Sequence, residues 1–396
     1  MREGAYATSR RVPLVVVRGG RVVDETAERD ADVVISDGRI VAVGENLDVA
    51  GGATVLEAHG CIVCPGLVDL HAHLREPGGE DAESVETGAR AASLGGFTAV
   101  VAMPNTDPPI DNAAVATEVM SLGARATCRV DVAGAITVGR MGERLAPLAE
   151  LYALGVRIFT DDGSAVQDAG VMRRALEYAK GLDHRAVRAV LAQHCEVEAL
   201  SAGGAMNEGI WSSLLGVPGS PVEAEELMVE RDIALAALTG GRVHFMHLSS
   251  ARSAGLVESA KARGLAVSAE VTPHHLALSD ERLRSFDPLY KVNPPLRTPE
   301  GRDGPAAGLR PGHGRRRGHR PRSTSDALEG RAARTGVLRH ARARDRAGGG
   351  HGFVVPRGTN VRAPRSTTPA TLARRRSRRA GSAHGHRLRA AHARGA

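Results

Sequence analysis

The sequence predicts an α/β fold: a (β/α)8 barrel of the TIM type, with a small N-terminal β-sheet domain. Three observations lead to this prediction. Before Ile62, short apolar runs alternate with period two and are separated by glycine-containing turns. After Ile62, seven apolar, strand-like segments alternate with segments of helical periodicity, which is typical of a parallel barrel. From residue 302 to residue 396 this patterning stops.

Residues 1–61 are predicted to form the small β-sheet domain. Its apolar runs are LVVVRGGRVVD, ADVVISDGRIVAVGENL and ATVLEA. Their period-two alternation, together with the SDG and GG turns, favours β-hairpins over helices.

Residues 62–301 are predicted to form the barrel, which the sequence leaves incomplete. The strand-like segments are IVCPGLVDLHAHL, FTAVVAMPN, VDVAGAITV, GVRIFTDDG, AVLAQHCE, VHFMHLSS and AVSAEVTPHHL. The clearest helical segments are ESVETGARAASLGG, GVMRRALEYAKGL, EAEELMVERDIALAALTGG and RSAGLVESAKARG. Because a parallel barrel carries its chemistry at the C-terminal ends of its strands, the residues that end each strand are the candidates for a functional site.

Residues 302–396 have a different composition from the rest of the chain. They contain 24 Arg and no Lys against four acidic residues, a balance of 24 − 4 = +20, whereas the whole chain carries +7, which leaves 7 − 20 = −13 for residues 1–301. With a single Phe and no Ile, Met, Tyr, Trp or Cys, this Arg-rich segment is expected to be non-native or disordered.

The predicted location of the protein is the cytoplasm, without a membrane anchor. No run of eighteen uncharged apolar residues occurs, and the N-terminal sequence lacks the apolar core of a signal peptide. The four cysteines are too few and too scattered for a disulfide framework.

Metal-ligand side chains stand at the ends of several predicted strands. His71 and His73 alternate along the first strand, so both imidazoles point to the same face and can share one metal ion. Three later strands end with further ligand types, namely Asp161 or Asp162, His194 and His247. Histidines and a carboxylate suit zinc or a similar divalent ion, which would activate water for hydrolysis of an amide-like bond.

The segments VDLHAHLREPG, VVAMPNTDP, IFTDDGSAVQD, AQHCE, HLSS and VNPPLR resemble the amidohydrolase superfamily, specifically dihydroorotases of the bacterial zinc-dependent type. The resemblance runs from residue 62 to residue 297. It implies a two-zinc centre in which His71 and His73 bind the first ion, Asp162 bridges both, and His194 and His247 bind the second. The sequence alone does not separate Asp161 from Asp162 as the bridge.

The same resemblance implies a cyclic amide hydrolase of pyrimidine biosynthesis that interconverts N-carbamoyl-L-aspartate and dihydroorotate. His73, Arg75, Asn105 and Asn293 are then the substrate-binding residues, with the Arg75 guanidinium matched to the substrate carboxylate. The resemblance also implies that strands from the far C-terminus complete the small sheet domain.

One motif of the resembled family is missing. After NPPLR the family has a strand ending in ATDHAPH, whose aspartate binds the first metal and serves as general base and acid, and no such motif follows Arg297. If Gly318–Thr324, GHRPRST, is encoded by GGC CAC CGA CCA CGC TCC ACA and followed by T, the same bases read from the second letter give ATDHAPH. The segment RHARARDRA can likewise be read one frame over as GMLGLETAL, which resembles the family's next segment. We therefore hypothesise a frameshift between about Pro299 and Gly314, so that this polypeptide lacks its catalytic aspartate and has negligible activity.

Alternative functions follow from other features. The resembled superfamily also contains allantoinases and hydantoinases, but the carboxylated lysine of hydantoinases has no counterpart in GVRIFTDDGS. A non-catalytic dihydroorotase-like subunit that supports aspartate carbamoyltransferase would need no metal ligands, yet five are present. A basic tail selected for nucleic acid is disfavoured because residues 302–396 lack Lys and carry a single aromatic residue for stacking on bases.

Overall fold

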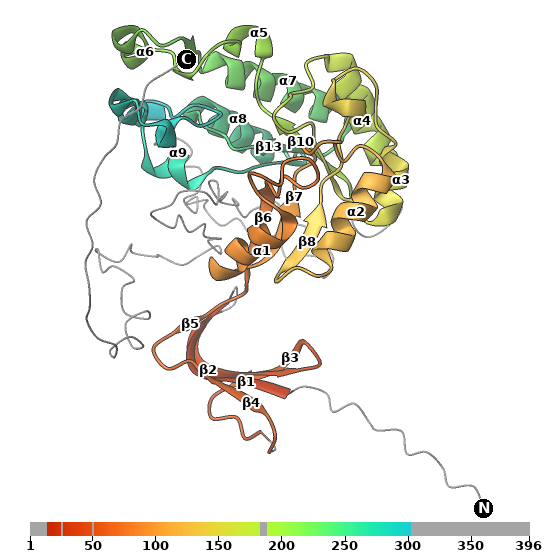
Figure 1. Ribbon diagram of the computed structural model, residues 1–396, viewed down its shortest axis with the longest axis vertical. Coiled ribbons are helices and arrows are strands. Elements are labelled where there is room, and N and C mark those ends of the chain that lie inside the picture. Colours follow the sequence, from red (N-terminus) through yellow and green to blue (C-terminus); the bar gives the residue numbers. More distant parts are fainter. Residues whose placement is uncertain (1–13, 25–26, 50, 183–187, 302–396) are drawn as a thin grey trace, which may run out of the picture. The chain divides into compact units, whose positions relative to one another are not determined.

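The computed structural model describes residues 14–24, 27–49, 51–182 and 188–301 (Figure 1). The Arg-rich segment 302–396, with the hypothesised frameshift and the decoded motifs, lies outside the described residues. None of the helices in the described ranges has the length and apolar character needed to span a bilayer.

The N-terminal strands form a five-stranded sheet. Its strands are β1 (Leu14–Val23), β2 (Glu28–Ser36), β3 (Arg39–Gly44), β4 (Thr54–Glu57) and β5 (Ile62–Val63). β1 pairs antiparallel with β2, and β2 with β3. The SDG turn joins β2 to β3 as predicted, because Asp37 and Gly38 both adopt the positive φ values, 52° and 69°, that a two-residue hairpin turn favours.

Two glycine pairs in this region do not make hairpins. Gly19 and Gly20 lie inside β1, where the register with β2 shifts; Gly19 has φ of +66° and its N–H donates to the Asp32 carboxylate over 2.8 Å. After Gly51 and Gly52, strand β4 pairs parallel to β1. The hairpin prediction is therefore wrong for ATVLEA, because two strands that pair in parallel cannot be joined to each other by a tight turn.

Seven parallel strands follow the small sheet, in agreement with the predicted alternation. They are β6 (Leu67–Ala72), β7 (Phe97–Ala102), β8 (Arg129–Val132), β9 (Ile158–Phe159), β10 (Val190–His194), β13 (Val243–Met246) and β14 (Val267–Ala269). β6, β7 and β8 pair in that order, as do β9, β10, β13 and β14, and a parallel bridge between Gly134 and Phe159 joins the two groups. Among the described residues, β6 and β14 each pair with one strand only.

Helices pack against these strands and supply the core on their outer side (Figure 1). The longer helices are α1 (Val85–Leu94), α2 (Ala113–Gly123), α3 (Leu148–Leu154), α4 (Ala169–Gly181), α7 (Glu223–Thr239) and α8 (Ala251–Ala262). Shorter elements lie in the connections after the strands: α5 (Glu198–Ser201), α6 (Ile210–Leu215), α9 (Pro273–Ala277), strands β11 (Met206–Asn207) and β12 (Gly219–Ser220), and 3-10 turns at Val138–Arg140, Asp280–Ser285 and Pro288–Tyr290.

The local sequence explains where the helices begin. Ser84, Asn112, Asp168 and Ser250 are N-caps whose side chains accept hydrogen bonds from the first-turn amides of α1, α2, α4 and α8. Strand alternation explains the two sides of the core. Val243 and Phe245 of β13 point outward into the large helix-packed core, whereas Met246 belongs to the small apolar cluster inside the barrel.

Candidate metal centre

The first histidine pair lies at the end of β6. Strand β6 ends at Ala72, and the His71 and His73 side chains on either side of it both reach the carboxylate of Asp162, which follows β9. The Nε2 atoms of His71 and His73 lie 3.2 and 3.4 Å from the Asp162 Oδ2 atom. The alternation predicted from the sequence therefore brings both rings to one oxygen of one carboxylate.

The second histidine pair faces the other oxygen of the same carboxylate. His194 ends β10 and His247 follows β13. Their Nδ1 and Nε2 atoms lie 2.9 Å apart, and 3.6 and 3.9 Å from the Asp162 Oδ1 atom. The five predicted ligands thus form two sets of three donors, each within a span that one metal ion could fill, with Asp162 common to both.

The neighbouring Asp161 points elsewhere. Its carboxylate accepts hydrogen bonds from the backbone N–H groups of Ile136 and Thr137, at 2.8 and 3.0 Å, and from the Thr137 hydroxyl. Burial raises the pKa of Asp161, and these hydrogen bonds act against that rise. Asp161 therefore anchors the segment after β8, and only Asp162 lies between the histidine pairs.

The charges of the cluster are strongly coupled. Burial alone would raise the pKa of Asp162, but the charges of His71 and His73, together with hydrogen bonds from His194 and His247, hold that pKa well below its usual range. Burial would lower the pKa of His194, yet Asp162 and Glu196 raise it to about 9. The hydrogen bond from His194 in turn lowers the pKa of Glu196 to about 2. The imidazoles supply the positive charge that faces the buried Asp162 carboxylate, and a divalent cation would supply it in their place.

The predicted substrate residues border the centre. The Asn105 side-chain oxygen lies 3.0 Å from His73 Nδ1, and its Nδ2 lies 3.5 Å from Asp162 Oδ2. Asn293 Nδ2 donates to Glu196 Oε2 over 3.2 Å. Arg75 is half-buried just beyond His73 and has φ of +64°, a left-handed conformation that a non-glycine residue rarely adopts.

Two carboxylates at the centre were not predicted from the sequence. Glu196 Oε2 lies 2.8 Å from His194 Nε2. Glu270, which follows β14, lies 2.5 Å from His71 Nδ1 and 3.3 Å from His244 Nε2. The signal for Glu270 was present, since it is an acidic residue at the end of the seventh apolar strand.

The second histidine of TPHHL, His275, serves the fold. His275 is buried, with Nδ1 2.7 Å from the Thr272 hydroxyl and Nε2 2.9 Å from the Pro294 carbonyl oxygen. This contact ties the start of α9 to the NPPLR segment. Arg297 of the same segment is buried and donates to Ser249, Asn207 and the Ser220 carbonyl oxygen, which fixes the loop that carries Asn293.

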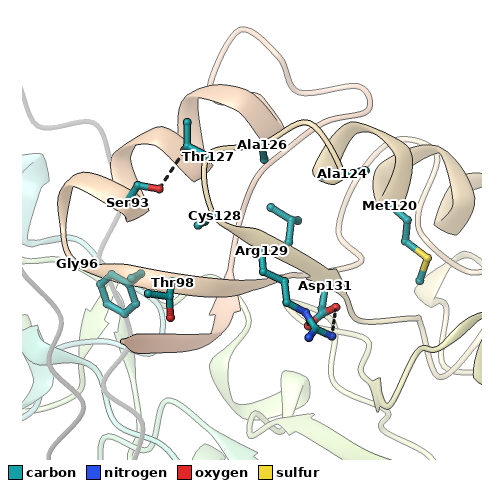
Figure 2. A pocket seen from close by; sticks show the side chains of 13 residues that line it. Ser93, Gly96, Thr98, Met120, Ala124, Ala126, Thr127, Cys128, Arg129 and Asp131 are labelled. Carbon is teal, nitrogen blue, oxygen red and sulfur yellow. Dashed lines mark hydrogen bonds and ion pairs between the residues drawn. The ribbon is translucent and has the colours of Figure 1, made fainter. Parts of the chain in front are cut away.

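A hollow of about 870 Å³ lies away from this centre. Figure 2 shows it at the beginnings of β7 and β8, near Gly96, Thr98 and Arg129. Its polar side chains largely pair with each other: Ser93 with Thr127, and Arg129 with Asp131. No histidine lines it, and both histidine–aspartate sets found in the described residues lie at the opposite ends of the strands.

Known proteins are similar in sequence to this chain over most of the described residues. Residues 60–253 match the family model described as Dihydro-orotase-like. Among curated relatives named Dihydroorotase, that of Pelotomaculum thermopropionicum is 49% identical over 286 residues, 72% of this chain and 66% of the relative. That of Streptomyces coelicolor is 51% identical over 286 residues, 72% and 65% of the two chains. That of Solibacter usitatus is 45% identical over 298 residues, 74% and 68%. The chain spans slightly less than two thirds of the length of the first two relatives.

Solved structures of similar shape include hydantoinases. An L-hydantoinase from Arthrobacter aurescens matches with a TM-score of 0.65 and 22% identity, over 75% of this chain and 66% of that one. A D-hydantoinase from a Bacillus sp. AR9 matches with a TM-score of 0.62 and 27% identity, over 74% and 66%. These likenesses bear out the predicted barrel fold, and the sequence matches are closer to dihydroorotases. By its sequence, its strand order and its histidine–aspartate cluster, this chain belongs to the dihydroorotase-like family.

Proposed function

We propose that the gene encodes a dihydroorotase, a cyclic amide hydrolase that interconverts N-carbamoyl-L-aspartate and dihydroorotate in pyrimidine biosynthesis. The observation that carries the proposal is the position of Asp162, whose two carboxylate oxygens each face one histidine pair at 3.2 to 3.9 Å. This arrangement is that of a bridging ligand between two ions.

The donor set fits two zinc ions. Each set of three donors combines two imidazole nitrogens with a carboxylate oxygen, the ligand types that zinc prefers, and all but His73 are almost fully buried. When bound, such ions polarise an amide carbonyl and lower the pKa of water, so that hydroxide is available near neutral pH to attack that carbonyl. We propose His71 and His73 as ligands of one ion, His194 and His247 as ligands of the other, and Asp162 as the ligand of both.

The rim residues would hold an anionic substrate. Arg75 offers a planar, permanently charged fork that suits the carboxylate of dihydroorotate. Asn105 and Asn293 offer amide groups on either side of the cluster, and the contact of Asn105 with His73 and Asp162 brings a hydrogen-bonding group within reach of the reacting amide. His73 would then border both the metal and the substrate.

The chain as written is expected to be almost inactive. In the part of the chain that the structure describes, no further aspartate joins Asp162 at the histidine cluster, and the sequence after Arg297 has no ATDHAPH motif. Without that carboxylate, no group takes a proton from the attacking water and delivers it to the departing nitrogen. We propose that a frameshift between about Pro299 and Gly314 removed it.

Two measurements test this function. The first is cyclisation of N-carbamoyl-L-aspartate with added zinc, for this chain and for a matched version whose reading frame is corrected so that GHRPRST reads ATDHAPH. We expect turnover only for the corrected version. Turnover by the uncorrected chain at a similar rate would contradict the proposed loss, and inactivity of a folded, zinc-loaded corrected version would contradict the dihydroorotase assignment. The second is the nucleotide sequence of codons 297–325, where an in-frame reading of GHRPRST without a compensating shift would remove the frameshift.

Other amidase substrates belong in the same assay. A hydantoinase would use a lysine near the Asp162 position, and GVRIFTDDGS contains none. We therefore expect the corrected version to prefer dihydroorotate over hydantoin and allantoin. The cytoplasmic location and an association with aspartate carbamoyltransferase stay predictions from the sequence.

A further inference from the structure

Glu270 occupies a buried position beneath the candidate metal centre. It directly follows β14 and is 3% exposed. Its carboxylate contacts the imidazoles of His71 at 2.5 Å and His244 at 3.3 Å. Burying a carboxylate costs folding free energy unless the carboxylate is paired and hydrogen-bonded. The two imidazoles supply such partners to Glu270.

The contact with His71 uses the ring nitrogen that does not face Asp162. Nδ1 of His71 points to Glu270, while Nε2 lies 3.2 Å from Asp162 Oδ2. A hydrogen bond from Nδ1–H to this carboxylate leaves Nε2 as the ring nitrogen whose lone pair a bound metal ion would take. Carboxylate partners of this kind fix the orientation of histidine ligands and increase their basicity.

The same carboxylate also holds the second histidine pair. Glu270 Oε1 accepts a hydrogen bond from the His247 N–H over 3.3 Å, and the Glu270 carbonyl oxygen accepts from the Leu248 N–H over 2.9 Å. His247 has φ of +36°, a backbone conformation that needs support from its surroundings. Glu270 therefore contacts one ligand of each pair.

Glu270 also connects the two end strands of the described barrel. In residues 14–301, β6 and β14 do not pair with each other, yet the His71–Glu270 contact joins a residue of β6 to the residue after β14. The side-chain contact thus sets the distance between the first and last described strands at the level of the metal centre.

We propose that Glu270 is a positioning residue for both metal sites: it holds His71 with Nδ1 protonated and supports the backbone of His247. The proposal rests on the metal centre proposed above but not on the identity of the substrate, and metal binding can be measured without turnover. His244, the other partner of Glu270, is not required for the contact with His71.

The test measures metal affinity and histidine protonation in the full chain. Glu270→Ala, Glu270→Gln and two controls are titrated with Co²⁺, followed by its visible absorption, and with Zn²⁺ in competition with a chelator. The control Asp32→Ala removes a buried carboxylate of the small sheet that accepts two backbone hydrogen bonds. The control His244→Ala removes the partner of Glu270 that is not a metal ligand.

We expect Glu270→Ala to weaken metal binding by about 10-fold to 100-fold, the usual effect of losing such a partner, and both controls to stay within about threefold of the parent chain. Glu270→Gln should recover part of the loss, because its amide oxygen still accepts from Nδ1–H. In ¹⁵N-histidine spectra, with or without zinc, the parent should show an exchange-protected Nδ1 proton on His71 that Glu270→Ala lacks.

Three outcomes would overturn the proposal. They are unchanged metal affinity in Glu270→Ala, an equal loss of affinity in Asp32→Ala, which would indicate general destabilisation, and absence of the protected Nδ1 proton in the parent chain. Failure of the dihydroorotase assay alone would leave these readouts intact, so the two proposals fail separately.

Discussion

Asp162 differs from Asp161 in what its carboxylate contacts, although the two residues are adjacent. Asp162 lies between four imidazoles, and Asp161 accepts hydrogen bonds from Ile136 and Thr137. Successive side chains at the end of a strand point in different directions, so only one of the two can enter the barrel mouth. The two adjacent aspartates therefore have different roles: Asp162 faces the histidine pairs, and Asp161 holds the segment after β8.

Substitution of each aspartate by asparagine should distinguish these two roles. Asp162→Asn keeps the size of the side chain but replaces one oxygen by an NH2 group, so we expect zinc affinity to fall by more than about 100-fold, beyond the effect of losing an outer partner. Asp161→Asn should leave zinc affinity nearly unchanged and lower the free energy of unfolding by about 1–3 kcal/mol. The loss of charge weakens the hydrogen bonds from the Ile136 and Thr137 N–H groups, and an NH2 group replaces the oxygen that accepts from the Thr137 hydroxyl. Chelator competition and urea unfolding check the two values; an equal loss of zinc affinity in both variants would contradict the assignment.

The pair of His194 and Glu196 makes the stability of the metal-free protein depend on pH. The pKa of Glu196, about 2, lies below its ordinary 4.5, so its contribution is full above pH 4.5 and is lost as the pH falls toward 2. The pKa of His194, about 9, lies above its ordinary 6.5, so its contribution is full below pH 6.5 and is lost as the pH rises through 9.

From these shifts we expect this pair to stabilise the metal-free protein most between pH 4.5 and pH 6.5. Urea unfolding of chelator-treated protein at pH values below, within and above this range measures the effect. Glu196→Gln is the matched variant, because it removes the carboxylate charge that stabilises the protonated His194. Its stability should change less with pH on both sides, and a profile identical to that of the parent would show that the pair does not contribute.

At the level of elements, the loops after β6 and β7 are packed closely enough to exclude a methyl group. Gly78 has φ of +86°, and a Cβ built on it would lie 2.2 Å from the Asp107 carbonyl oxygen. The Asp107 N–H donates to the Pro77 carbonyl oxygen over 3.0 Å. These two loops carry Arg75 and Asn105, so their contact sets the relative positions of two predicted substrate residues.

Alanine at Gly78 should therefore be more damaging than its conformation alone explains. Gly264 is the control: it also has positive φ, +83°, but open space around its Cβ position. We expect Gly264→Ala to lower the free energy of unfolding by about 1–2 kcal/mol from the left-handed conformation, and Gly78→Ala by about 2–5 kcal/mol because backbone overlap adds to it. Urea unfolding measures both, and equal losses would mean that the loops can move apart.

At the level of the whole molecule, seven parallel strands enclose the centre, and the described residues leave the outer edges of β6 and β14 without a strand partner. Unpaired backbone groups at a strand edge reduce stability and favour association with other chains. A closed barrel needs a further strand between these edges, and the family's missing motif belongs to such a strand.

The version with the corrected reading frame should accordingly be more stable as well as active. We expect a melting temperature at least several degrees above that of the uncorrected chain, since about 1 kcal/mol already changes this temperature by roughly 2–4 °C in domains of about 150–250 residues. Scanning calorimetry and light scattering, at matched zinc concentrations, measure the melting temperature and the association state. Equal melting temperatures would contradict the view that the missing segment completes the barrel.

The sequence by itself determined the order of the elements along the barrel and predicted which side chains would bind metal. Seven apolar segments, several of them ending in histidine or aspartate, were enough for this prediction. Strand periodicity, and the residues with which each strand ends, can be read from short stretches of sequence. Only the tertiary structure decided between Asp161 and Asp162, made β4 a parallel partner of β1, and brought Glu270 against His71. These features depend on which residues distant in the chain come into contact, and such contacts follow from packing in three dimensions rather than from any pattern along the chain.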